Sequence, residues 1–345
     1  MMAAMALATV LSGLAGSAAA TGSAHPGRAV VKVQVGMVSF ADTKHGWASG
    51  PMGALLRTKD GGRHWKRQYI LEPSFVDQSA YSVEAVSAKV CWALGSGGAI
   101  YRTTNAGSKW TRVARRLRPS RFTGNCWWYC RFVGQRGWIV STCGDIVGTT
   151  NGGATWSWQR KAAGGDDSVG GFSAAGAGHA FVALNAAGGH YVLATTDGKT
   201  WKQVGPRPFL WWNPQFQGIR AENASRIWVA ARMGEVFLSE DGGQTWRVSN
   251  DGVGPDQLVV NSIGGYGTTL FVGGSPASGS VNSGAAVLST SDGASWGWAS
   301  FSSVTTAPGT IGTTEWASEK TGWIVAWGGT IYRTQDGGAT WHKQY

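Results

Sequence analysis

Charged residues are scarce in this 345-residue sequence, at 14%, and acidic ones are the scarcer kind, with 19 Asp and Glu against 30 Lys and Arg. The resulting net charge of +11 favours an anionic partner or surface. The positive residues form no Lys/Arg-rich block and no nucleic-acid-binding motif occurs, so we do not expect nucleic acid to be that partner. Amphipathic helical periodicity is lacking as well, which argues against a helical fold.

Long apolar runs are absent beyond the first 24 residues, so we expect no transmembrane segment in the mature chain. Residues 1–24 are small and apolar and end in Ala-rich sequence typical of signal-peptide cleavage, which predicts export to the periplasm or the extracellular space. No Lys or Arg precedes this stretch. A start further upstream and a disordered Ala/Gly tail therefore stay open as alternatives.

Cysteine is rare, with four residues, and neither a second C-x-x-C pair nor a closely spaced His pair accompanies it. Zinc sites need such groups of ligands, so we predict no metal site, and nothing in the sequence indicates a cofactor.

Glycine and tryptophan are abundant instead, at 53 and 20 residues. Both occur in the stretch IYRTQDGGATW, where Gly permits a tight turn, Asp and Thr oxygens accept hydrogen bonds from the turn, and Trp begins a strand. The same pattern occurs seven times, and its Trp residues follow at intervals of 45 or 46 residues, with one interval of 50. The acid or amide and the Trp of the seven copies are Asp60, Trp65, Asn105, Trp110, Asn151, Trp156, Asp197, Trp201, Asp241, Trp246, Asp292, Trp296, Asp336 and Trp341.

A second aromatic column precedes each turn, as in GWASG (Trp47), CWALG (Trp92) and GWIVAW (Trp323). Each unit of about 45 residues then contains four short apolar segments separated by turns, which is the size of one propeller blade. We therefore predict an all-β fold, a single seven-bladed β-propeller over residues 34–345. The copies ending at Trp201 and Trp296 are one residue shorter, so their turns should differ in geometry.

The motif T-x-D-G-G-x-T-W is the Asp-box, or BNR, repeat of sialidases, sortilin, xyloglucanases and the Ycf48/HCF136 photosystem II assembly factors. The combination of a GW strand, I-Y-R-T and D-G-G-x-T-W most closely resembles the Ycf48-like group, over residues 34 to 345. The resemblance implies a protein-binding or assembly role. The resemblance is stronger evidence for the architecture than for the function, because the box occurs in proteins with unrelated activities.

Residues 25–33 form an N-terminal extension, and its segment RAVVKV (28–33) is surplus to the four strands of each blade. We predict that it pairs with the edge of the last blade as a clasp.

Three cysteines lie in the third blade. A hairpin between Phe132 and Trp138 would place Cys126 opposite Cys143, which predicts a disulfide in an exported protein. Cys91 and Cys130 either pair between blades or remain buried thiols.

Candidate binding residues lie in the connections between blades, which we expect on the face opposite the D-G-G turns. They are the arginines and tryptophans of two connections and of the third blade's first strand: Arg115, Arg116, Arg118, Arg121, Trp127, Trp128, Arg207, Trp211 and Trp212. A solvated loop is the alternative for the arginines, and packing over a blade edge is the alternative for the tryptophans.

A basic sector is a second candidate surface. Arg57, Arg102 and Arg333 precede the box Thr in the first, second and last blades, which become neighbours when the ring closes. Lys66, Arg67, Arg112 and Lys343 would extend the sector along the following strands. Protection of exposed strand edges by positive charge is the alternative explanation.

We predict a non-catalytic monomer that binds a protein or an anionic glycan. The sialidase F/Y-R-I-P motif is missing, one propeller is too few for a xyloglucanase cleft, and turn hydrogen bonds should occupy the box carboxylates. The alternative is a carbohydrate-binding or glycosidase-like propeller that uses acids outside the boxes: Asp77, Asp145, Asp166, Asp167 and Asp256.

Overall fold

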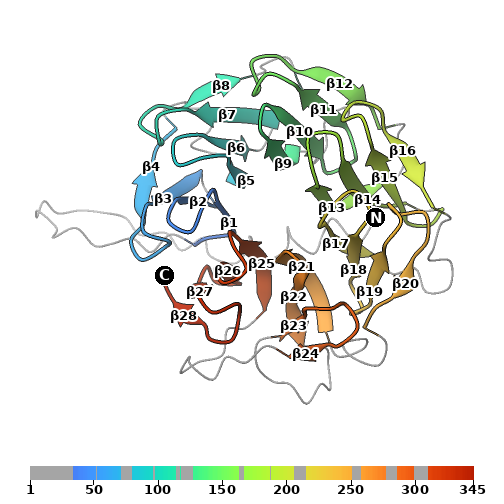
Figure 1. Ribbon diagram of the computed structural model, residues 1–345. Coiled ribbons are helices and arrows are strands. Elements are labelled where there is room, and N and C mark those ends of the chain that lie inside the picture. The colour runs from blue at the N-terminus through green and yellow to red at the C-terminus, as the bar shows by residue number, and fades with distance from the viewer. Residues whose placement is uncertain are drawn as a thin grey trace, which may run out of the picture. The chain divides into compact units, whose positions relative to one another are not determined.

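The computed structural model describes residues 34–345 except 52, 71–79, 96–97, 114–116, 118–126, 163–166, 187, 206–214, 251–257, 277–285 and 299–309. Gln34–Tyr345 form one compact unit. Its described residues form seven four-stranded antiparallel sheets, which follow one another around a ring (Figure 1). The predicted seven-bladed propeller is thereby confirmed. The proposed clasp, residues 28–33, lies outside the described residues and stays a prediction.

Every blade consists of four consecutive strands, numbered outward from the centre of the ring. Blade 1 comprises β1 (Met37–Phe40), β2 (Gly46–Gly50), β3 (Ala54–Thr58) and β4 (Lys66–Gln68). Blade 2 comprises β5 (Ala80–Ala85), β6 (Cys91–Gly95), β7 (Ala99–Thr103) and β8 (Thr111–Val113). Blade 3 comprises β9 (Trp127–Val133), β10 (Arg136–Ser141), β11 (Ile146–Thr149) and β12 (Ser157–Arg160). Blade 4 comprises β13 (Ser168–Ala174), β14 (Ala180–Asn185), β15 (Tyr191–Thr195) and β16 (Lys202–Val204).

The remaining blades repeat this order. Blade 5 comprises β17 (Phe216–Ala221), β18 (Ile227–Ala231), β19 (Val236–Ser239) and β20 (Arg247–Val248). Blade 6 comprises β21 (Leu258–Tyr266), β22 (Thr269–Pro276), β23 (Ala286–Thr290) and β24 (Gly297–Trp298). Blade 7 comprises β25 (Ile311–Trp316), β26 (Gly322–Ala326), β27 (Ile331–Thr334) and β28 (His342–Lys343).

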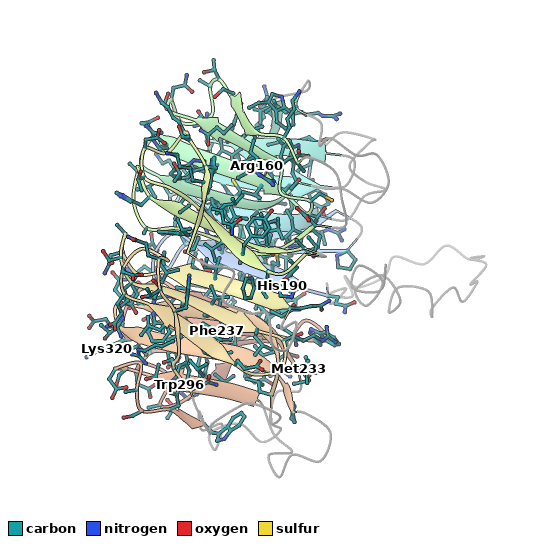
Figure 2. The ribbon with its side chains drawn as sticks, turned by 90° about the vertical axis from the view of Figure 1, so that its right-hand side faces the viewer. Arg160, His190, Met233, Phe237, Trp296 and Lys320 are labelled. Atoms are coloured by element: carbon teal, nitrogen blue, oxygen red, sulfur yellow. The ribbon has the colours of Figure 1, made fainter. Side chains whose placement is uncertain are left out.

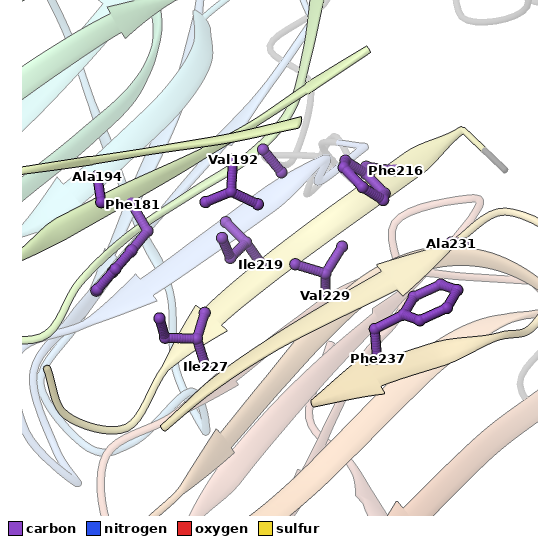
Figure 3. Close-up of a cluster of buried hydrophobic side chains, with 10 residues drawn as sticks. Phe181, Val192, Ala194, Phe216, Ile219, Ile227, Val229, Ala231 and Phe237 are labelled. Atoms are coloured by element: carbon purple, nitrogen blue, oxygen red, sulfur yellow. The ribbon is translucent and has the colours of Figure 1, made fainter. Parts of the chain in front are cut away.

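The core lies between blades, because each sheet packs its apolar faces against the next. Figure 3 shows one such cluster, in which Phe181 and Val192 of blade 4 meet Ile219 and Val229 of blade 5. The second strands are the most deeply buried, and the aromatic column predicted along them includes Trp47, Trp138 and Trp323, all at 0% exposure. Burial of these large rings is the main stabilising contribution of each blade.

Each Asp-box is a turn closed by its own side chains. In the last box, the Thr334 hydroxyl donates to Asp336 and accepts from the Gly338 N–H, and Asp336 accepts from the Thr340 N–H at 2.9 Å. Gly337 and Gly338 have φ of +76° and +94°, which explains the glycine pair. The box carboxylates are therefore occupied within their turns, as predicted.

The two shorter boxes have a different geometry, as predicted. Asp197 accepts from the N–H groups two and three residues ahead, those of Lys199 and Thr200, rather than four residues ahead. Asp292 repeats this arrangement with Ala294 and Ser295.

The box turns and the turns between first and second strands share one side of the ring, which we call the box face. The first Gly N–H of a box donates to a carbonyl of that other turn, as Gly61 does to Lys44 and Gly337 to Lys320. The turns between second and third strands lie on the opposite side, the connection face. In the edge-on view of Figure 2, Lys320 and Met233 lie at opposite faces. Lys320 belongs to the turn between β25 and β26, and Met233 to the turn between β18 and β19.

Contacts between blade 7 and blade 1 close the ring. The Trp323 indole stacks on Phe40 at 3.4 Å, and its Nε1 donates to the Gly61 carbonyl at 2.9 Å. Arg333 donates to the Thr43 carbonyl at 3.1 Å. Side chains of the repeated columns therefore join the two ends of the propeller.

Candidate functional site

The first strand of every blade borders the centre of the ring (Figure 1), and one residue of each first strand pairs with the second-strand aromatic. We call these seven residues the channel ring: Ser39, Glu84, Arg131, Ser173, Arg220, Gly264 and Glu315. Their types differ from blade to blade, although their register is constant.

Four members of the channel ring join their blade to the next. Each accepts a hydrogen bond from the backbone N–H of the residue that follows the next blade's ring position. Ser39 accepts from Ala85, Glu84 from Phe132, Ser173 from Ala221, and Glu315 from Phe40. Glu315 thus closes the ring at its innermost layer.

Three charged members of the channel ring interact across blades 2, 3 and 7. Arg131 donates to the Glu84 carboxylate at 2.7 Å and to the Cys130 carbonyl. Burial raises the pKa of Glu84, against the lowering effect of Arg131, while the Glu84 carboxylate raises the pKa of Arg131. Burial raises the pKa of Glu315 to about 7, with Arg131 and the Phe40 N–H acting in the opposite direction. The ionisation of Glu315 therefore changes near neutral pH.

A cavity of about 600 Å³ lies against five members of the channel ring, Arg131, Ser173, Arg220, Gly264 and Glu315. Its other walls include Glu222, Asn223 and Thr268, which belong to box-face turns or strand ends. The volume is within the range of small-molecule sites. The sequence pointed to the connection face, whereas this cavity lies at the box-face end of the channel.

A second charged group lies at the edge of this cavity, in blade 5. Glu222 pairs with Arg220 at 3.2 Å and with Arg226 at 3.5 Å, and it accepts from the Trp228 indole at 2.8 Å. Arg220 also donates to the Gly267 carbonyl, and Arg226 pairs with Glu240. The charges of this group are matched within the protein.

The outer strands of blades 7, 1 and 2 form a basic edge, on the left of Figure 1. We define it as four outer-strand residues, Lys66, Arg67, Arg112 and Lys343, together with Arg63 and Lys109 of the box turns that precede β4 and β8. Most of these side chains are exposed, and Arg67 lies over the ring of Tyr69, which is 62% exposed. Among the described residues, each outer strand pairs on one side only, which leaves backbone groups along the edge without a strand partner there.

Known proteins agree with this architecture. Residues 29–208, more than half of the chain, match the family described as photosynthesis system II assembly factor YCF48. The chain belongs to this family. No curated protein matches the sequence.

Solved YCF48 structures share the fold. YCF48 bound to D1 peptide is 18% identical, with a TM-score of 0.67 over 88% of this chain and 91% of that one. YCF48 from Cyanidioschyzon merolae is 16% identical, with a TM-score of 0.68 over 89% and 97%. The GH74 enzyme from Niastella koreensis is 15% identical, with a TM-score of 0.58 over 90% of this chain and 59% of that one. At these identities, the similarity shows the fold alone.

The predicted arginine sector of this YCF48-family chain has structural contacts. Arg57, Arg102 and Arg333 each stack on the second-strand Trp of their own blade, with distances of 5.2 to 5.5 Å from guanidinium carbon to ring centre. Arg57 also donates to the Ala88 carbonyl of blade 2, as Arg333 does to blade 1. Arg333 is 6% exposed. Arg57 and Arg333 therefore hold neighbouring blades together beneath the basic edge, and partner binding by the three arginines stays a prediction.

Most of the predicted connection-face residues lie outside the described residues: Arg115, Arg116, Arg118, Arg121, Arg207, Trp211 and Trp212. Trp127, expected at the surface, is fully buried, because its ring packs near Trp158 and its Nε1 donates to the Leu117 carbonyl. Trp128 is half-buried on β9. The two consecutive tryptophans differ in burial at a β-bulge, in which Trp127 pairs with Ser141 and Trp128 is the extra residue.

The cysteine predictions have separate outcomes. β9 and β10 pair in the expected register through Tyr129 and Val140, and a bulge then shifts the register before Ser141. Cys126 lies outside the described residues, so its disulfide with Cys143 stays a prediction. Cys91 and Cys130, which the sequence left undecided, are buried free thiols whose pKa values burial raises well above normal.

Acids outside the boxes were the candidates for glycosidase chemistry. Asp145 is buried and accepts from the Ala162 N–H at 2.8 Å, and Asp167 accepts from the Tyr191 hydroxyl at 3.3 Å. Asp77, Asp166 and Asp256 lie outside the described residues. Within the described ranges, no group of three or more His, Cys, Asp or Glu is arranged to hold a metal ion, and no helix could cross a membrane.

Proposed function

We propose that this YCF48-family propeller is a non-catalytic protein-binding or assembly scaffold, and that its basic edge binds an acidic, extended segment of a partner protein. The observation that carries the proposal is the uneven charge of the outer strands. The outer strand of blade 1 has Lys66 and Arg67 and its box turn adds Arg63, whereas β24 of blade 6 has no charged residue and its box turn has only Asp292.

Two physical features of the edge favour such a segment. The outer strand β4 has a row of unpaired backbone groups, to which an extended peptide can add as a further strand. Positive side chains on an edge strand oppose pairing with most strands, and an acidic strand would instead be attracted. Edge protection and selective binding are thus compatible.

Relatives support a peptide partner. One of the solved YCF48 structures holds D1 peptide, so a propeller of this fold can bind a peptide. We extend this class of ligand to the present chain, together with export directed by residues 1–24.

The non-catalytic part of the proposal rests on the occupied carboxylates. All seven box acids or amides bond within their turns, and Glu84 is paired with Arg131. We expect no turnover of aryl glycosides or sialosides. If the protein hydrolysed such a substrate and Glu315→Gln abolished the activity, the non-catalytic part of the proposal would be wrong.

A binding titration tests the proposed surface. The probe is a fluorescein-labelled peptide of about ten residues in which Glu and Thr alternate, a length that suits strand addition. We compare Lys66→Glu/Arg67→Glu/Lys343→Glu with the control Lys199→Glu/Lys202→Glu/Arg247→Glu, which changes the net charge equally on blades 4 and 5. The fluorescence anisotropy should show affinity for the wild type and the control, and about tenfold weaker binding to the first variant.

Raising the salt concentration should also weaken binding, because exposed charges are screened within about 3 Å at 1 M ionic strength. A Lys/Thr peptide of equal length should not bind. Equal loss of affinity in both variants would show that net charge alone attracts the peptide, and the basic edge would then not be the site.

A further inference from the structure

The channel cavity contains two charged groups with different balances. Both carboxylates of the Arg220 group are paired, because Glu222 contacts Arg220 and Arg226, and Glu240 contacts Arg226 and Arg247. Its polar atoms are also engaged with Trp228 and the Gly267 carbonyl. This side of the cavity therefore has no unpaired carboxylate to offer a cation.

On the opposite side of the cavity, one carboxylate has no matching positive charge. Arg131 is matched by Glu84, whose two oxygens accept from Arg131 and from the Phe132 N–H. Glu315 forms no ion pair with any described residue. Its hydrogen bond from the Phe40 N–H leaves acceptor capacity on the carboxylate, which has about four lone-pair sites.

We propose that this cavity is a binding site for an organic cation, an alkylammonium or guanidinium group, whose charge is neutralised by Glu315. A cation with N–H donors supplies both the charge and the hydrogen bonds that this carboxylate lacks. The cavity volume of about 600 Å³ leaves room for an attached carbon chain.

The remaining walls suit such a ligand. Ser173, Asn223 and Thr268 offer hydroxyl and amide groups, and Tyr266 offers an aromatic ring. The preference for a cation is opposite to that of the whole chain, whose net charge is +11. The site is also distinct from the basic edge, which lies on the outer strands.

A proton competes with the ligand for Glu315. The groups that face this carboxylate are Arg131 on β9, Glu84 on β5 and the Phe40 N–H on β1. Arg220, Glu222 and Tyr266 lie elsewhere on the cavity wall. Because the pKa of Glu315 is raised to about 7, affinity for a cation should be complete at pH 8 and fall by about tenfold at pH 6.

Ligand-observed NMR of the full chain tests the proposal with two isosteric probes, butylguanidinium and the neutral butylurea. We expect the wild type to bind butylguanidinium, with the stated loss at pH 6, and to bind butylurea at least tenfold more weakly. These comparisons need no variant.

Variants locate the site. Glu315→Gln keeps an oxygen for the Phe40 N–H and should lose at least tenfold in affinity for butylguanidinium. Glu319→Gln, an exposed carboxylate in the neighbouring turn, should bind as the wild type does. Absence of binding, equal binding of the two probes, or unchanged binding to Glu315→Gln would overturn the proposal, whatever the result for the acidic peptide.

Discussion

At the scale of single residues, the Asp-box shows how one side chain fixes a turn. Asp241 accepts hydrogen bonds from the Thr245 hydroxyl and N–H, and these bonds lower its pKa to about 2. Two of the seven boxes achieve the same closure without a charge. Asn151 accepts from the Thr155 N–H at 2.9 Å and donates to the Thr155 hydroxyl at 2.8 Å.

The first prediction concerns Asp241→Asn. A carboxyl whose folded pKa lies below its unfolded value stabilises the fold above the unfolded pKa, about 3.9, and loses this contribution as the pH falls toward 2. The variant should match the wild type at pH 7, since Asn151 shows that the amide fits, and should lose less stability between pH 4 and pH 2. Urea unfolding across this range measures the difference, and parallel curves for both proteins would contradict it.

The second prediction concerns Ala106, which occupies the first Gly position of the second box with φ of +60°. This conformation is unfavourable for residues with a Cβ atom. Ala106→Gly should therefore raise the free energy of unfolding by about 0.5–1 kcal/mol, after the added flexibility of the unfolded chain is subtracted. The control Ala339→Gly, in the last box, should lower it. Chemical denaturation measures both effects. If neither substitution stabilised the protein, backbone strain at Ala106 would not be the explanation.

At the scale of elements, the blades are joined by side chains that repeat in register. Arg333 stacks on Trp323 within its blade and donates to Thr43 of blade 1, so it ties the two ends of the ring together. The equivalent Arg57 ties blade 1 to blade 2.

The third prediction follows from this arrangement. Arg333→Gln should lower the free energy of unfolding by about 2 kcal/mol, the sum expected for a charged hydrogen bond and a cation–π contact. Lys343→Gln, on the exposed neighbouring strand, should change it by less than about 0.5 kcal/mol. Acidic-peptide affinity per folded Arg333→Gln molecule should stay unchanged. If Arg333→Gln instead bound the peptide more weakly and kept full stability, Arg333 would be part of the binding surface.

The sequence predicted the elements well because their signals are local. The spacing of the box Trp residues predicted seven blades, and the shorter boxes at Asp197 and Asp292 predicted turns of different geometry. The contacts of the channel ring were not predicted, since they join residues 46 to 48 positions apart, or the two ends of the propeller, and the residue types vary from Ser to Glu to Arg. Counting back from each second-strand aromatic along its hairpin would have located these positions, although not the pairing of Glu84 with Arg131.

Burial was harder to predict than strand position. Trp127 and Trp128 are adjacent and aromatic, and only the packing near Trp158 shows which of them is inside. Arg57 and Lys66 are both basic and lie opposite each other on β3 and β4. Only Arg57 has the stacked Trp47 and the carbonyl of the next blade within reach.

At the scale of the whole molecule, the propeller separates its charges radially. The centre has an unmatched carboxylate at Glu315, whereas the outer edge of blades 7, 1 and 2 is basic. The apolar faces between blades provide the stability, and this leaves the channel and the edge available for binding. The central claim of this account is that a partner's acidic segment pairs with the basic edge.

Amide hydrogen exchange with and without the Glu/Thr peptide tests this claim most directly, because it locates the bound peptide on the full chain. Strand addition should slow exchange in one or more of β4 (Lys66–Gln68), β8 (Thr111–Val113) and β28 (His342–Lys343), and leave β16 and β20 unchanged. Protection confined to the connection face or the channel, or equal protection around all seven outer strands, would contradict the account.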